Sequence, residues 1–104
     1  EEVFNEWNYN GNCALVVGAT YPAELAIVRR IVGDAMPLLV PGIGAQGGDV
    51  EKTLQAGLNG QKRGLIINSS RAIIFASQEA DFAQKAREAT EQRKEEINNY
   101  RYMV

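Results

Sequence analysis

Apolar residues gather into three short runs, and a segment with helical character follows each run. The runs are Cys13–Gly18, Leu38–Val40 and Gly64–Ile67, centred about every 25 residues. Their apolar residues are consecutive rather than alternating, which is typical of strands covered on both faces in a parallel sheet. The intervening helices supply the connection that parallel neighbours require. The pattern therefore predicts three consecutive strand–helix units of an α/β fold.

Two of the connecting helices carry recognisable start signals. Thr20 and Tyr21 offer a cap for the first helix, and Pro22 suits its first turn. The first helix should end near Gly33. Its apolar stripe is formed by Leu25, Val28, Ile31 and Val32. Asp49 is the predicted N-cap of the second helix, in which every fourth residue is apolar. These apolar residues are Val50, Leu54 and Leu58.

The two ends of the chain lie outside these units. Residues 3–7 carry apolar side chains at helix-compatible spacing before a turn-forming segment at 10–12, so we expect the end of a helix and then a turn. After the third run, a turn should lead into a short helix over 72–76. A long charged helix is predicted from Glu79 to about Tyr102, packed on the outside of the sheet rather than forming a coiled coil. Its apolar stripe, which Arg93 interrupts, consists of Phe82, Ala86, Ala89, Ile97 and Tyr100.

Length and composition indicate one small globular domain. The chain has 104 residues, of which 45% are hydrophobic and 23% charged. No apolar run approaches the roughly 18 residues typical of a membrane-spanning helix, and the first residues do not resemble a signal peptide, so we expect a cytoplasmic protein. The chain starts at Glu1 and its opening segment resembles the middle of a protein. We therefore expect residues 1–104 to form a single partial domain from a longer chain.

Charge and residue types remove several classes of function. The net charge is −2, from eleven basic and thirteen acidic residues, and no basic block indicates a nucleic-acid surface. The chain has no histidine, which excludes histidine-based triads and ordinary zinc sites within it. Its single cysteine, Cys13, starts an apolar run and is expected to be a small buried side chain.

The loop after the second run is the strongest candidate for a binding site. Residues 42–47 fit the dinucleotide pattern GxGxxG between a strand and a helix. A dinucleotide fold needs an acidic residue about 20 positions further on, whereas the next strand here ends in a serine-rich turn with Arg71. Arg71 and the free amides near Ser69 and Ser70 suit a phosphate instead. Alternatively, the glycines only permit a tight crossover and Arg71 is a solvated surface charge.

Two successive loops suited to one anion are typical of a particular fold. In a (β/α)₈ barrel, the loops after the seventh and eighth strands often form a phosphate site at the C-terminal face. The chain would then be the last part of such a barrel. Pro41 and Ile43 flank the glycine loop, where they could border a flat ring beyond the phosphate or simply pack the end of the strand.

Three ordered motifs resemble one enzyme family. Residues 16–22, 39–49 and 67–71 read VVGATYP, LVPGIGAQGGD and INSSR, and they closely resemble orotidine 5′-phosphate decarboxylases, particularly the longer bacterial subfamily. The resemblance covers most of residues 13–77. It implies the C-terminal part of a TIM (β/α)₈ barrel, with about three βα units and a long C-terminal helix. It also implies decarboxylation of orotidine monophosphate to uridine monophosphate without a metal or organic cofactor.

The resemblance also assigns roles to residues of both loops. It implies that Gln46 reaches the substrate phosphate and pyrimidine, with Gly47 beside it. Arg71 would hold the phosphate together with a backbone amide near Ser70. Pro41 and Ile43 match apolar residues that line the base pocket.

The catalytic residues of that family have no counterpart in this chain. They form an Asp-x-Lys-x-x-Asp pattern on earlier strands, and no such segment occurs here. Three of eight strands would leave two strand edges and part of an apolar face uncovered. We therefore expect the chain to be inactive alone and to need the N-terminal portion, with a homodimer as the complete protein. The alternatives are a non-catalytic phosphate- or nucleotide-binding module and a dinucleotide-binding half-domain.

Overall fold

Three parallel strands form the sheet of the computed structural model, which describes residues 6–43 and 49–103. The strands are β1 (Leu15–Val16), β2 (Leu38–Val40) and β3 (Leu65–Ile67), and they neighbour one another in chain order. The three predicted strands are thus confirmed, although the first is shorter than the apolar run. Backbone bonds from the Val17 and Ala19 amides to the carbonyls of Leu39 and Pro41 extend its pairing beyond β1.

The helices follow the strands as expected, with two differences at their starts. They are α2 (Pro22–Val32), α3 (Val50–Gly57), α4 (Arg71–Ile74) and α5 (Phe82–Arg101). Proline begins α2 as predicted, but no side chain of the described residues caps this helix, so the cap expected from Thr20 or Tyr21 is wrong. The long helix begins later than Glu79 because the Ser77 hydroxyl accepts the Glu79 amide at 3.1 Å and holds a turn there.

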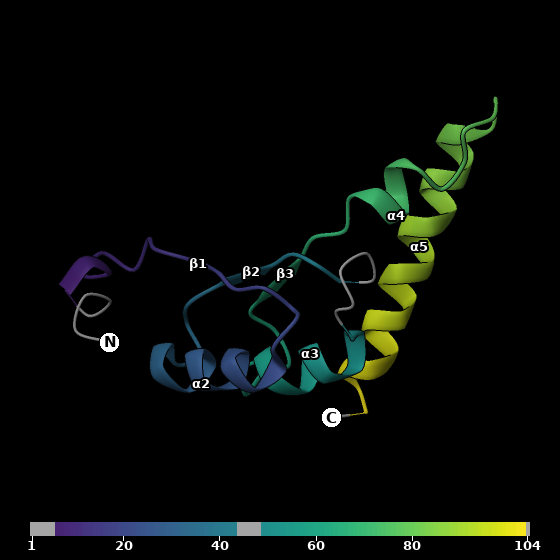
Figure 1. Cartoon of the computed structure of the whole chain (residues 1–104). Coiled ribbons are helices and arrows are strands. Elements are labelled where there is room, and N and C mark those ends of the chain that lie inside the picture. The colour runs from purple at the N-terminus through teal and green to yellow at the C-terminus, as the bar shows by residue number, and fades with distance from the viewer. Residues whose placement is uncertain (1–5, 44–48, 104) are drawn as a thin grey trace.

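The helices cover one face of the sheet, and α5 extends away from it. In Figure 1, α2 and α3 lie beneath the strands, while α5 runs from beside α3 up to α4. The contacts of α5 with the core come from Ile97 and Tyr100 near its end. Phe82, at its start, is 61% exposed. The predicted apolar stripe therefore packs on the core only over its C-terminal half, and the N-terminal half lies against α4.

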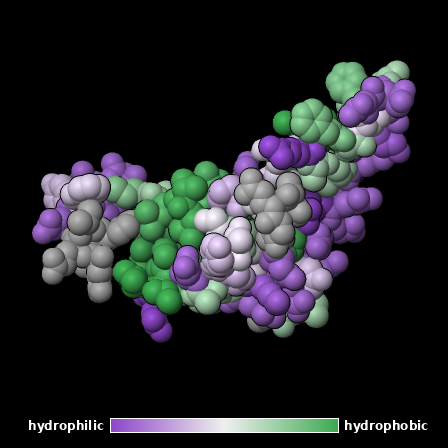
Figure 2. Space-filling model, in the orientation of Figure 1, coloured by the Kyte–Doolittle hydropathy of each residue, from purple (hydrophilic) through white to green (hydrophobic). Residues whose placement is uncertain are grey.

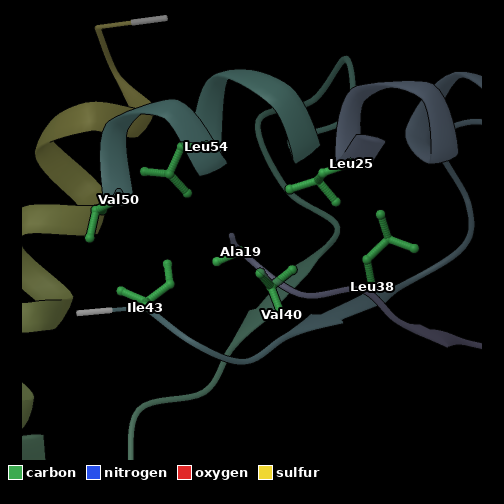
Figure 3. Close-up of a cluster of buried hydrophobic side chains, with 7 residues drawn as sticks. All are labelled: Ala19, Leu25, Leu38, Val40, Ile43, Val50 and Leu54. Atoms are coloured by element: carbon green, nitrogen blue, oxygen red, sulfur yellow. The ribbon is translucent and has the colours of Figure 1, made fainter. Parts of the chain in front are cut away.

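The core lies between the sheet and its two covering helices (Figure 3). Leu38 and Val40 of β2 are fully buried against Leu25 of α2 and Leu54 of α3. Alternate residues point to opposite faces of a sheet, so the residues between these positions face the other way. The buried cluster comprises Ala19, Leu25, Leu38, Val40, Ile43, Val50 and Leu54.

The opposite face of the sheet carries an apolar row that the described residues leave open. Val16, Leu39 and Ile66 are register partners across the three strands. Val16 is 68% exposed and Ile66 is 55% exposed. Within the described residues the strands are thus covered on one face only, which agrees with the uncovered apolar face expected for three strands of an eight-stranded barrel. Figure 2 shows apolar surface over β1 and α2, and again around α4 and the start of α5.

The N-terminal residues form a turn as predicted. Residues 6–7 are helical, and the Asn8 side chain accepts the amide of Cys13 at 2.9 Å. Cys13 is half-buried rather than buried, and its thiol lies 3.5 Å from the Trp7 carbonyl oxygen. Residues 3 and 4 of the predicted helix lie outside the described residues.

A buried arginine joins the elements at the end of the sheet where the strands begin. Arg29 of α2 is only 7% exposed, and its guanidinium donates to four backbone carbonyls at 2.7–3.0 Å. These carbonyls lie at the ends of both covering helices and just before β2 and β3. They belong to Gly33, Met36, Gly57 and Gly64. Burial lowers the pKa of Arg29, and the Asp34 carboxylate partly offsets that shift. We call Arg29 and its four carbonyl partners the arginine clamp. The helical pattern of the sequence did not indicate it.

Asp49 caps α3 as predicted, and removing its carboxylate should weaken the helix. Its Oδ1 accepts the Lys52 amide at 2.9 Å. We expect Asp49→Ala to lower the free energy of unfolding by about 1 kcal/mol, measured by urea denaturation. The control is Gln55→Ala on the exposed side of α3, which should change stability by less than about 0.5 kcal/mol. Equal losses in the two variants would contradict a capping role.

Candidate functional site

The carboxyl ends of β2 and β3 open into one small pocket. It has a volume of about 110 Å³ and is lined by Pro41, Gly42, Ile43, Asn68, Ser69, Ser70 and Arg71. The two segments lie side by side because β2 and β3 are parallel neighbours, and the Asn68 amide still bonds to the Val40 carbonyl at 3.2 Å. Gly42 turns the chain with φ of +92°, a conformation that glycine adopts without strain.

The serine-rich turn presents a cation and a helix start at this pocket. Ser70 precedes α4, and its carbonyl accepts the amides of Ile73 and Ile74. Arg71 is exposed and forms no ion pair with any carboxylate of the described residues. A free guanidinium beside backbone amides is suited to bind a phosphate. The structure thus brings both predicted phosphate residues of this turn, Ser70 and Arg71, into one pocket.

The two apolar residues predicted for a base pocket line the same cavity. Pro41 is half-buried, whereas Ile43 is only 1% exposed and belongs to the core cluster (Figure 3). Most of the Ile43 side chain therefore packs the end of the strand, which was the alternative interpretation. Pro41 keeps more of its surface available to a ligand.

The remaining predicted site residues cannot be compared with the structure. Gln46 and Gly47 lie outside the described residues, as does most of the glycine pattern at 42–47. Their contacts with a phosphate stay predictions. Asn68 lines the pocket as well, although its serine-rich neighbours predict only a turn at this position. The available signal was its spacing, because it lies two residues after Ile66 and so belongs to the same face of β3.

Larger hollows lie along β3 and α5. One of about 420 Å³ and one of about 400 Å³ share the walls Leu65, Ile67 and Ile97. Both lie between β3 and α5, and one of them also reaches α3. Within residues 6–43 and 49–103, no three acidic, cysteine or histidine side chains are grouped so as to hold a metal ion. Nor is any helix in this part of the chain long and apolar enough to cross a membrane.

The chain is similar to a set of curated bacterial enzymes over almost its whole length. It is 58% identical to the orotidine 5′-phosphate decarboxylase of Cupriavidus metallidurans over 102 residues, which are 98% of this chain and 37% of the relative. The orotidine 5′-phosphate decarboxylase of Bordetella avium is also 58% identical, over 99 residues that are 95% of this chain and 36% of the relative. The chain thus spans little more than a third of these relatives. No protein-family model matches it.

Two solved structures share the fold of this chain. Leishmania donovani UMP synthase superposes with a TM-score of 0.77 at 44% identity, covering 98% of this chain and 21% of that protein. Leishmania donovani OMP decarboxylase gives a TM-score of 0.69 at 42% identity, covering 93% of this chain and 34% of that protein. The predicted fold class is confirmed: the three strand–helix units are part of a TIM (β/α)₈ barrel, followed by a long helix.

Proposed function

Because the chain belongs, over the portion of the fold that it spans, to the orotidine 5′-phosphate decarboxylase family, we propose that it is the phosphate-binding C-terminal portion of such an enzyme. The complete protein would convert orotidine monophosphate to uridine monophosphate and carbon dioxide in cytoplasmic pyrimidine synthesis. The observation that carries this proposal is the single pocket where Pro41 and Ile43 meet Ser70 and Arg71.

Each part of the pocket suits one part of a nucleotide. The Arg71 guanidinium would bind the phosphate through two parallel hydrogen bonds, with an amide near Ser70 beside it. Pro41 and the exposed edge of Ile43 would border the pyrimidine. Gln46 and Gly47 would complete the phosphate site from the glycine loop. A volume of about 110 Å³ is below the ~300–1,000 Å³ of whole ligand pockets, so other segments must form the remaining walls.

The exposed apolar row on the open face of the sheet explains why this portion would have no enzymatic activity by itself. Val16, Leu39 and Ile66 are register partners on the open face of the sheet, and inward-pointing side chains from all strands fill the interior of a TIM barrel. The remaining strands would cover this row and pair with the free edges of β1 and β3. We propose that the N-terminal portion supplies them, together with the catalytic lysine and aspartate residues, and that the complete protein is a homodimer.

A chimera tests the proposal. This chain would replace the corresponding segment of the Cupriavidus metallidurans relative, to which it is 58% identical. We expect the chimera to decarboxylate orotidine monophosphate and the 104-residue chain alone to show no turnover. Ultraviolet absorbance of the pyrimidine follows the reaction. A chimera that is folded by circular dichroism but inactive would contradict the proposal, as would turnover by the chain alone.

A non-catalytic nucleotide-binding module is the second candidate. It is favoured by the fact that the described pocket is built within this chain and contains no acidic residue or lysine. Calorimetry with uridine monophosphate and uridine separates the two ideas when combined with the chimera. A module would bind the monophosphate with the chain alone, whereas a barrel portion would need the chimera for both binding and turnover.

A further inference from the structure

Two asparagine–glycine pairs occur in the chain, and each lies in a loop that leads into a strand. Asn10–Gly11 precedes β1, and Asn59–Gly60 precedes β3. An asparagine followed by glycine can modify itself, because glycine has no side chain to keep its backbone nitrogen away from the asparagine carboxamide. The two pairs are chemically the same, so any difference in their reactivity comes from the fold.

The reaction is deamidation through a cyclic imide. The backbone nitrogen of the glycine loses its proton and attacks the side-chain carbonyl carbon of the asparagine. The bond from that carbon to the side-chain nitrogen breaks, and ammonia leaves. Water then opens the ring at either carbonyl, which gives aspartate or isoaspartate. The net change converts an amide and water to a carboxylate and ammonium, and it needs no enzyme, oxidant or reductant.

The fold holds the Asn59 carboxamide away from this reaction. Its Oδ1 accepts the backbone amides of Gln61 and Arg63 at 2.9 and 3.0 Å, and its Nδ2 donates to the Asp34 carbonyl at 2.9 Å. Both lone pairs of the side-chain oxygen are thus used. The attacking group is occupied as well, because the Gly60 amide donates to the Asp34 carboxylate at 3.2 Å. Reaction at Asn59 therefore requires four hydrogen bonds to open.

The Asn10 carboxamide has no such restraint. Asn10 is exposed in the turn before β1, and within residues 6–43 and 49–103 no hydrogen bond joins its side chain to another residue. The Gly11 amide donates to the Asn8 carbonyl at 3.0 Å. Local opening of an exposed turn releases such a bond at low cost. Reaction at Asn10 therefore requires one hydrogen bond to open rather than four.

We propose that Asn10 is a site of spontaneous deamidation in the folded protein and that the loop contacts of Asn59 protect the second pair. The inference does not depend on the proposed function, because it uses only the hydrogen bonds of the two loops. Deamidation of Asn10 adds a negative charge to an exposed turn. Deamidation of Asn59 would remove the donor to the Asp34 carbonyl and add a carboxylate near that of Asp34, so the loop would lose its contacts once it was modified.

The test compares the folded chimera with the same protein in urea. Samples are kept in mildly alkaline buffer, which favours loss of the amide proton, and are then digested with trypsin for mass spectrometry. Cleavage after Lys52 and Lys62 isolates Asn59 in one peptide, and fragmentation identifies the modified residue in the peptide that contains Asn10. We expect Asn59 to deamidate at least about tenfold more slowly in the folded protein than in urea, because the reaction then requires local opening. Asn10 should deamidate at similar rates in both samples.

Variants at Asp34 test the protection of the second pair. Asp34→Ala removes the acceptor of the Gly60 amide, so Asn59 should deamidate faster in the folded chimera. Asp34→Asn keeps a carbonyl oxygen at this position and should keep much of the protection. Asn10→Gln is the control for the first pair, because the longer side chain of glutamine closes the ring much more slowly. The main acidic species on ion-exchange chromatography should therefore disappear in this variant.

Three outcomes would contradict the inference. Equal rates at Asn59 in the folded protein and in urea would overturn the protection. An Asn10 that stayed intact in the folded protein while it deamidated in urea would overturn the exposed site. An Asp34→Ala chimera that was folded by circular dichroism, but deamidated at Asn59 no faster than the unchanged chimera, would show that the contact of Gly60 with Asp34 does not protect the pair.

Discussion

Replacing Arg29 with methionine should lower the free energy of unfolding by about 3–5 kcal/mol. The arginine clamp donates to four backbone carbonyls at 2.7–3.0 Å from a side chain that is 7% exposed. Methionine fills a similar volume but donates nothing, so buried acceptors at the ends of both covering helices lose their partner. Urea denaturation followed by circular dichroism measures the loss.

Two further variants test whether stability depends on the several N–H donors of the planar guanidinium. Arg29→Lys keeps the charge but cannot reach carbonyls in several directions at once, so we expect it to recover only part of the stability. Arg30→Met, on the exposed side of the same helix, should change stability by less than about 0.5 kcal/mol. If Arg29→Met were as mild as Arg30→Met, the four hydrogen bonds would contribute little to the fold.

Replacing Arg71 with alanine should mainly raise the KM for orotidine monophosphate in the chimera. Loss of a charge-assisted contact with the phosphate is worth about 1.5–3 kcal/mol, which corresponds to roughly a 10- to 150-fold fall in kcat/KM. The proposed catalytic groups lie elsewhere in the barrel, so kcat should change much less. Steady-state kinetics over a wide range of substrate concentration separates the two constants.

The controls for Arg71 use a second arginine and a second ligand. Arg87→Ala removes an exposed arginine of α5 that pairs with Glu91 at 3.0 Å, and it should leave both kinetic constants unchanged. Arg71→Lys should recover part of the loss, because lysine keeps the charge without the planar fork. Binding of uridine, which has no phosphate, should not respond to Arg71→Ala. An unchanged kcat/KM in Arg71→Ala would show that this arginine does not hold the phosphate.

Local sequence signals predicted most of the fold. The consecutive apolar runs were enough for three parallel strands, and the Asp49 carboxylate was enough for the start of α3. The errors occurred where longer-range packing decides the structure. The apolar stripe of α5 does not contact the core near Phe82, because the first turns of the helix lie beyond the edge of the small sheet (Figure 1). The open face of the sheet, by contrast, was expected, because apolar runs of this kind are covered on both faces only when the whole barrel is present.

The site was predicted less evenly than the fold. Arg71 stood out because it follows a strand, and the structure brings it together with Pro41 in one pocket. Asn68 was overlooked because its serine-rich neighbours indicate a turn, although its spacing of two residues from Ile66 places it on the open face of the sheet. Arg29 was overlooked for a different reason: an arginine in an amphipathic helix resembles a surface charge, and its backbone partners lie as far as 35 positions away.

The arginine clamp and the candidate site lie at opposite ends of the same strands. Residues at the strand entries hold the helices and sheet together, while residues after the strands line the candidate pocket. Substitutions of the exposed residues Asn68, Ser70 and Arg71 should therefore change ligand preference without lowering stability, whereas Ile43 is part of the core. Such a separation makes this barrel segment a suitable starting point for grafting loops with altered specificity, provided that Arg29 and its acceptors are retained.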